Sequence, residues 1–198
     1  MRILKQVTVI YTLLISSTLF AQTFPDHTTT TVNDFASVLP ARSAAALRAQ
    51  LTTLNRDTGI EMTVVTLASQ AAYAPGMEME TFATALFNHW GVGNAQRNDG
   101  IMVLVLPDDR AMRIELGAGF DQAWNTHAAR IVERDFLPHF RNGNYAVGIM
   151  LGADAVIDEI ALPFSEGATK PPTNVMTCLL YTSPSPRDLS TSRMPSSA

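Results

Sequence analysis

The sequence lacks the residues on which several classes of protein depend. It holds one cysteine, Cys178, in 198 residues, so a disulfide framework within a monomer is excluded. Basic residues are few: 14 Lys and Arg stand against 18 Asp and Glu, for a formal net charge of −4. No basic stripe is present, which argues against a nucleic-acid partner.

Signatures of common hydrolases are also missing. The four histidines, at 27, 89, 127 and 139, do not form the H-E-x-x-H spacing of a zinc protease. Ser43 and Ser69 do not lie in a G-x-S-x-G nucleophile elbow. The sequence therefore names no catalytic residue.

The first residues predict export from the cytoplasm. Met1-Arg2 and Lys5 form a positive start, and Val7 to Phe20 is apolar and ends at a small residue, Ala21. This pattern is typical of a secretory signal peptide over residues 1–21. The alternative is an uncleaved anchor, but the apolar run is shorter than the roughly 20 residues that span a bilayer. We expect a periplasmic or secreted protein.

The rest of the chain divides by composition. Residues 22–31 form an extended linker with Pro25 and several threonines, and residues 32–163 form one domain with a full core. Residues 164–198 are rich in Ser, Thr and Pro and have little to bury, so we expect a disordered tail. Residues 178–188 resemble a translated adapter, in which case the native carboxyl end would be missing, together with any second domain or membrane anchor that it carried.

Apolar periodicity predicts the elements of the domain. Helices are expected over 41–57, 77–90, 121–136 and 145–161, and strands over 60–67, 101–106 and 111–116. Residues 32–36 indicate a turn fixed by Asn33 and Asp34. The short turn at 107–110 requires an antiparallel pair, whereas the helical connections favour parallel pairing. The predicted fold is an α/β, three-layer α/β/α sandwich with a mixed sheet.

Several short pieces, taken in order, resemble the TPM domain family, an extracytoplasmic α/β/α module. They span most of residues 32–161 and are Val32-Asn33-Asp34-Phe35-Ala36, Thr58-Gly59-Ile60-Glu61, Trp90-Gly91-Val92-Gly93, Asn98-Asp99-Gly100-Ile101, and Arg113-Ile114-Glu115 with Gly117 and Gly119. The resemblance implies binding of calcium or another divalent cation, a phosphatase-like activity, and partners among membrane-protein complexes or other envelope proteins.

Three residues form a candidate metal site: Asp34, Asp99 and Asn125. Each lies in a predicted loop or at a helix start, and calcium takes oxygen ligands from carboxylates, amides and carbonyls. The family carries Asp at the position of Asn125, so weaker binding is expected here. The alternative is that all three residues cap helices or fix turns.

Gly117, Gly119 and Arg97 are candidate cofactor-binding residues. The two glycines precede a predicted helix, where backbone N–H groups can bind a phosphate, and Arg97 can pair with it. The alternative is that the glycines supply positive φ at a sharp turn.

These features predict an exported, cation-binding accessory module that assists assembly or maintenance of membrane-protein complexes. A metal-assisted acid phosphatase acting on phosphate monoesters is the alternative.

Overall fold

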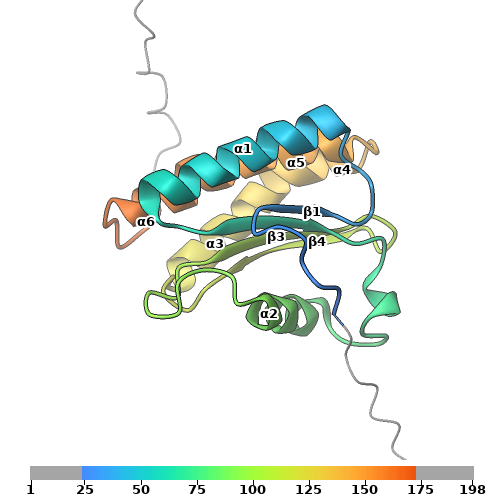
Figure 1. Cartoon of the computed structure of the whole chain (residues 1–198), viewed down its shortest axis with the longest axis horizontal. Coiled ribbons are helices and arrows are strands. Elements are labelled where there is room, and N and C mark those ends of the chain that lie inside the picture. The colour runs from blue at the N-terminus through green and yellow to red at the C-terminus, as the bar shows by residue number, and fades with distance from the viewer. Residues whose placement is uncertain (1–23, 173–198) are drawn as a thin grey trace, which may run out of the picture.

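A four-stranded sheet flanked by helices on both faces forms the body of the molecule (Figure 1). The computed structural model describes residues 24–172. The expected signal peptide and most of the expected tail lie outside these residues. Within residues 24–172, no helix combines the length and apolar character needed to cross a membrane.

The sheet is mixed, as predicted, with strand order β1-β2-β3-β4. Its strands are β1 (Val32–Asp34), β2 (Met62–Thr66), β3 (Ile101–Leu106) and β4 (Ala111–Leu116). The first three are parallel, and β4 pairs antiparallel with β3. The expected turn at 32–36 is wrong for its first half. Asn and Asp are poor strand formers, but pairing of Val32 with Val64 overrides their local preference.

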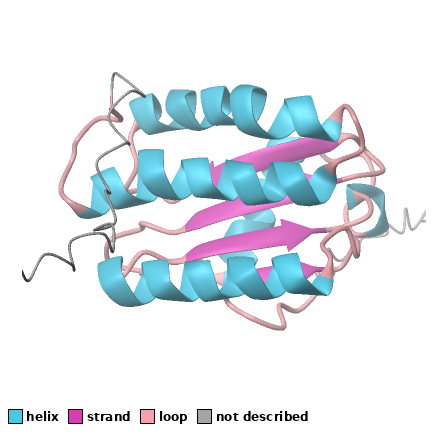
Figure 2. Cartoon of the chain, turned by 90° about the horizontal axis from the view of Figure 1, so that it is seen from above, coloured by secondary structure: helices cyan, strands magenta, loops and turns pink. Residues whose placement is uncertain are grey.

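Helices cover the two faces of the sheet unequally. Helices α1 (Ala41–Thr58), α3 (Gln122–Ile131) and α5 (Tyr145–Val156) pack on one face, and α2 (Met79–Trp90) packs on the other. Seen from above, the helices of the first face lie side by side over the sheet and run roughly along the strands (Figure 2). Strand side chains alternate between two cores, so Val64 joins one and Val65 joins the other. The predicted α/β/α sandwich is confirmed.

Two expected helices are interrupted by a π-helical turn. After α3 comes η2 (Val132–Phe136) and then α4 (Leu137–Phe140); after α5 comes η3 (Ile157–Ala161) and then α6 (Leu162–Ser165). Pro138 and Pro163 lie just beyond these turns. Proline lacks an N–H group and its ring clashes with the carbonyl four residues earlier. A π turn widens the helix at that point and relieves the clash.

The two parallel crossovers have opposite hands. Strands β1, β2 and β3 advance across the sheet in one direction, yet α1 and α2 connect them over opposite faces. Two right-handed crossovers that advance in the same direction would place both helices on the same face. One of the two connections is therefore left-handed, which sequence periodicity does not predict. The connection from β2 to α2 is long and contains a short 3₁₀ turn, η1 (Gln70–Ala72).

The packed domain extends beyond residue 163. The ring of Phe164 lies 4.0 Å from that of Phe120, and 5.8 Å from that of Trp124, between centroids. Residues 164–172 were expected to belong to a disordered tail; the structure instead places Phe164 against the main core. The contacts of this ring with two other aromatic rings offset the conformational entropy that the short segment loses when it becomes ordered.

We predict that Phe164→Ala lowers the free energy of unfolding by about 2 kcal/mol, because the aromatic contacts with Phe120 and Trp124 are lost. Leu162→Ala is the matched control, since Leu162 lies in the same helix but is 36% exposed. Its loss should be under about 1 kcal/mol. Urea denaturation followed by tryptophan fluorescence measures both. Equal effects of the two substitutions would show that Phe164 does not pack against the core.

Candidate functional site

The sequence motifs meet at one end of the sheet, where the parallel strands begin. Residues 91–100 connect α2 to β3, and residues 117–121 connect β4 to α3. The N–H of Gly117 donates to the carbonyl of Gly100 at 2.9 Å, and the N–H of Gly119 donates to that of Asn98 at 2.8 Å. The two loops therefore form one unit, which we call the amino-edge loops.

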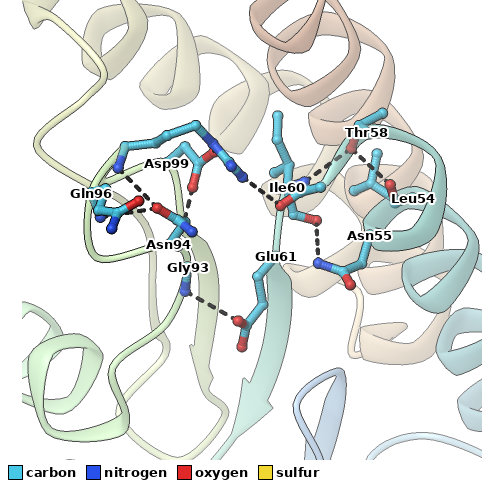
Figure 3. A network of polar contacts seen from close by, with 11 residues as sticks. Leu54, Asn55, Thr58, Ile60, Glu61, Gly93, Asn94, Gln96 and Asp99 are labelled. Atoms are coloured by element: carbon cyan, nitrogen blue, oxygen red, sulfur yellow. Dashed lines mark hydrogen bonds and ion pairs between the residues drawn. The ribbon is translucent and has the colours of Figure 1, made fainter.

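Asp99 is the buried acid of the amino-edge loops. Its side chain is 2% exposed, and its carboxylate accepts hydrogen bonds from the Arg97 Nε at 2.5 Å and from the Asn94 N–H at 3.2 Å (Figure 3). Arg97 also donates to the Gly59 carbonyl at 2.9 Å. The guanidinium neutralises the buried charge, and its second bond ties the loop to the end of α1.

Asn94 and Glu61 complete this network; neither was a candidate site residue, although Glu61 belongs to one of the pieces that resemble the family. The Asn94 side-chain oxygen accepts from the N–H groups of Gln96 and Arg97 at 2.9 and 3.1 Å, which forms an Asx turn. The Glu61 carboxylate accepts from the Gly93 N–H at 3.3 Å (Figure 3). The sequence signal for this turn was an Asn in a Gly-rich loop, because Asn side chains often accept hydrogen bonds from backbone N–H groups two or three residues later.

The glycines of the amino-edge loops are needed because backbones meet there. A Cβ atom added to Gly117 would lie 2.2 Å from the Asn98 carbonyl oxygen, and one added to Gly119 would lie 2.4 Å from that of Arg97. Neither glycine has positive φ. Both predictions for these glycines are therefore wrong: they do not serve a turn of positive φ, and their N–H groups already donate to carbonyls rather than facing a phosphate.

Asp34 lies at the opposite end of the sheet, where the parallel strands finish. Its carboxylate accepts from the N–H groups of Val38 and Leu39 at 3.1 and 2.9 Å and from the Thr66 hydroxyl at 2.5 Å. Asp34 is level with Thr66, which is level with Val105. Asp99 precedes Val105 by six residues, so the two acids are separated by roughly 20 Å along the strands.

Asn125 is not joined to either acid. It lies in the first turn of α3, where its side-chain amide donates to the Asp121 carbonyl at 3.3 Å. Asp121 is the helix cap and accepts from the N–H groups of Ala123 and Trp124. The expectation that Asp34, Asp99 and Asn125 share one cation is wrong, because topology places Asp34 far from Asp99. Nowhere within residues 24–172 do three His, Cys, Asp or Glu side chains gather as metal ligands would.

A second polar cluster is buried between α3 and η3. His127 is 3% exposed; its Nε2 lies 2.9 Å from a Glu159 oxygen and its Nδ1 lies 2.8 Å from an Arg130 nitrogen. Arg134 binds the other Glu159 oxygen at 2.5 Å. Because Arg130 has no acceptor, His127 Nδ1 accepts and Nε2 carries the proton. Burial lowers the pKa of His127, an effect that the contact with Glu159 opposes.

Comparison with known proteins identifies the fold and its family. A family model described as the TPM domain matches residues 32–159. No curated protein matches the chain. A solved N-terminal domain from P. gingivalis is 32% identical with a TM-score of 0.59, and the match covers 69% of this chain and 84% of that one.

Two more distant solved structures share the fold. The N-terminal domain of the cg2496 protein of Corynebacterium glutamicum is 16% identical, with a TM-score of 0.50 and coverage of 67% of this chain and 81% of that one. The BA42 protein of the psychrophilic bacterium Bizionia argentinensis is 17% identical, with a TM-score of 0.52 and coverage of 64% and 83%. At this identity the likeness shows the fold alone.

We predict that Gly117→Ala destabilises the fold by about 2–4 kcal/mol, since the new methyl group would overlap a backbone carbonyl that cannot move freely. Ala118→Ser, at the exposed neighbouring position, is the control and should change the free energy of unfolding by less than about 0.5 kcal/mol. Chemical denaturation measures both. An alanine at 117 that is tolerated without loss would show that the two loops are not in close backbone contact.

We predict that His127 makes stability depend on pH. Its pKa in the folded state is lowered from the usual 6.5, so the fold favours the neutral ring. The contribution is fully present above pH 6.5 and is lost as the pH falls below 6.5, because the unfolded chain takes up the proton first. Thermal melting of wild type and His127→Gln from about pH 7.5 to about pH 5, a range that brackets the usual histidine pKa, measures this pH dependence. A slope that is the same in both proteins would contradict it.

Proposed function

This chain belongs to the TPM domain family, and we propose that it serves as a non-catalytic accessory module for membrane-protein complexes outside the cytoplasm. One observation carries the proposal. The polar groups that the family motifs bring to the amino-edge loops are bonded to one another: Asp99 to Arg97 and Asn94, and the amides of Gly117 and Gly119 to carbonyls. Such a region holds loops rigid and leaves little for substrate chemistry.

The predicted leader supports the location. A positive start, an apolar run to Phe20 and a small residue at Ala21 are what export machinery recognises. A domain of this kind outside the cytoplasm would meet the exposed parts of membrane proteins. The net charge of −4 and the absence of a basic stripe from the sequence favour a protein partner over an anionic lipid surface.

The alternative, a phosphatase, lacks support from the geometry of the same loops. Phosphoryl transfer needs donors aimed at the phosphate oxygens and a nucleophile placed in line with the leaving group. The Gly117 and Gly119 amides donate elsewhere, and Arg97 is held by Asp99 and the Gly59 carbonyl. The residues present do not fit a cation bridging Asp34 and Asp99, so the proposal does not depend on calcium.

We predict no turnover of a phosphate monoester such as p-nitrophenyl phosphate, with or without calcium, above the level of the Asp99→Ala variant. The same preparations are titrated with calcium during thermal melting, because a ligand of the folded state must raise the melting temperature. Turnover in wild type that disappears in Asp99→Ala would overturn the proposal and restore the phosphatase.

A second measurement tests the partner class. The purified chain should sediment with envelope membranes, and treating those membranes with protease beforehand should abolish the binding. Vesicles of protein-free lipid, zwitterionic or anionic, should not bind it. Binding to lipid alone, or binding that survives the protease treatment, would contradict a membrane-protein partner.

A further inference from the structure

The outer edge of β4 carries backbone groups that face away from the sheet. The Ile101 N–H donates to the Glu61 carbonyl, on the β2 side, at 2.9 Å, and the Val105 carbonyl accepts from Leu67 on the same side at 3.0 Å. Odd-numbered residues of β3 therefore bond toward β2, and even-numbered residues bond toward β4.

The same alternation fixes the direction of each peptide group in β4. Gly117 lies level with Gly100 and bonds to it, and the pairing continues with Glu115 opposite Met102 and Arg113 opposite Leu104. These residues bond inward to β3. The N–H and C=O groups of Met112, Ile114 and Leu116 consequently point outward, along the free edge.

Open space lies beside this edge. A cavity of about 760 Å³ is lined by Met112, Arg113 and Ile114 of β4, by Glu80 of α2 and by residues of α3. Helices α2 and α3 cover opposite faces of the sheet, so a cavity that reaches both must lie beyond the edge strand. A second cavity of about 500 Å³ shares Met112 and Leu137 with it and extends the groove along β4.

The other edge of the sheet is protected. Strand β1 has three residues, and the segment before it folds back on Asn33. The Asn33 side-chain oxygen accepts from the N–H groups of Thr28 and Thr29 at 2.8 and 3.1 Å, and its amide donates to the Thr29 carbonyl at 2.7 Å. A short edge closed by side-chain bonds is a usual protection against strand addition, and β4 has no such cover among the described residues.

We propose that β4 pairs antiparallel with β4 of a second copy of this chain, about a two-fold axis that passes through Ile114. In this register Ile114 lies opposite its own copy, and Met112 lies opposite Leu116. All three present outward N–H and C=O groups, so they form the hydrogen-bonded positions of the new ladder. The two sheets become one continuous sheet, and the contact closes as a dimer because it is the same surface on both copies.

Charge selects this register over its neighbours. With Ile114 at the axis, Arg113 of each copy lies opposite Glu115 of the other, at the closer, non-hydrogen-bonded positions. Placing the axis at Arg113 sets Arg113 opposite Arg113, and placing it at Glu115 sets Glu115 opposite Glu115. Both shifts put like charges together at the centre, which disfavours them.

Both charged side chains are already held on the face that α2 covers. The Arg113 Nε donates to Glu115 at 2.6 Å, and another Arg113 nitrogen donates to Glu80 at 2.9 Å. Glu115 also accepts from the Thr84 hydroxyl at 2.8 Å. An edge that carried lysines alone would repel its copy, whereas this alternation of sign attracts it. On the other face, beside Ile114, the groove is lined by apolar Ala129, Val132 and Leu137 and by polar Gln122, Asn125 and Thr126.

The pairing goes beyond the proposed function and does not depend on it. The paired residues, 112–116, all belong to β4 and not to the amino-edge loops. Analytical ultracentrifugation of the purified chain should show a dimer. Arg113→Glu alone and Glu115→Arg alone should each weaken self-association by about tenfold or more, since two symmetric pairs become repulsive. An equimolar mixture of the two variants should restore a dimer, because each supplies the sign that the other lacks.

A backbone variant tests the same register without changing charge. Met112→Pro removes an N–H that faces outward, so it should abolish the dimer and leave the β3–β4 ladder intact, as circular dichroism will show. Met112→Val keeps the N–H and should remain dimeric. A wild-type chain that sediments as a monomer overturns the proposal. So does a dimer that survives Met112→Pro, or a mixture of the two charge variants that stays monomeric while both are folded.

Discussion

The contact between the two amino-edge loops is the constraint on which the rest of the structure depends. Here backbones of residues 97–100 and 117–119 approach so closely that a Cβ atom on Gly117 or Gly119 would overlap a carbonyl oxygen. Asp99, buried beneath this contact, orders the loop through Arg97 and Asn94. Arg97 carries the constraint to Gly59 at the end of α1, so one contact fixes the end of α1, the start of β3 and the exit from β4.

This constraint explains how the molecule divides its surface. At the end of the sheet where β1, β2 and β3 begin, backbone bonds and the ion pair of Asp99 with Arg97 hold the two loops together, and the β1 edge is covered by the segment bonded to Asn33. Beside β4, a groove runs between α2, α3 and α4. The residues at this end that were predicted to bind a cation or a phosphate thus bond to one another or to nearby backbone, and the edge of β4 carries the surface that we propose for association.

Most of the fold could be predicted from the sequence, because apolar periodicity and glycine or proline at element ends are local signals. The helices and the three longer strands follow from them. Strand β1 could not be predicted, since Asn33 and Asp34 adopt extended structure only beside β2. The π turns follow from Pro138 and Pro163, but proline alone does not distinguish a π turn from a helix end.

The predicted metal site failed for a topological reason. Residues at the end of one parallel strand and residues before the start of another lie at opposite ends of the sheet, and Asp34 is the last residue of β1 whereas Asp99 precedes β3. That distinction was available from the predicted strand at 101–106, but the strand before Asp34 was not recognised. Gly117 and Gly119 show a different limit. A side chain is excluded at these two positions by backbone of a loop roughly twenty residues earlier in the chain, a separation typical of a supersecondary unit. No local sequence pattern reveals such a contact.

Amide hydrogen exchange at Gly117 and Gly119, followed by NMR with and without inorganic phosphate, tests the central claim most directly. Both amides donate to carbonyls of the neighbouring loop. We therefore expect them to exchange as slowly as amides of β3 and to keep their chemical shifts when phosphate is added. Rapid exchange, or a shift at both amides on adding phosphate, would show that these groups are free to bind an anion and would contradict a scaffolding role for the amino-edge loops.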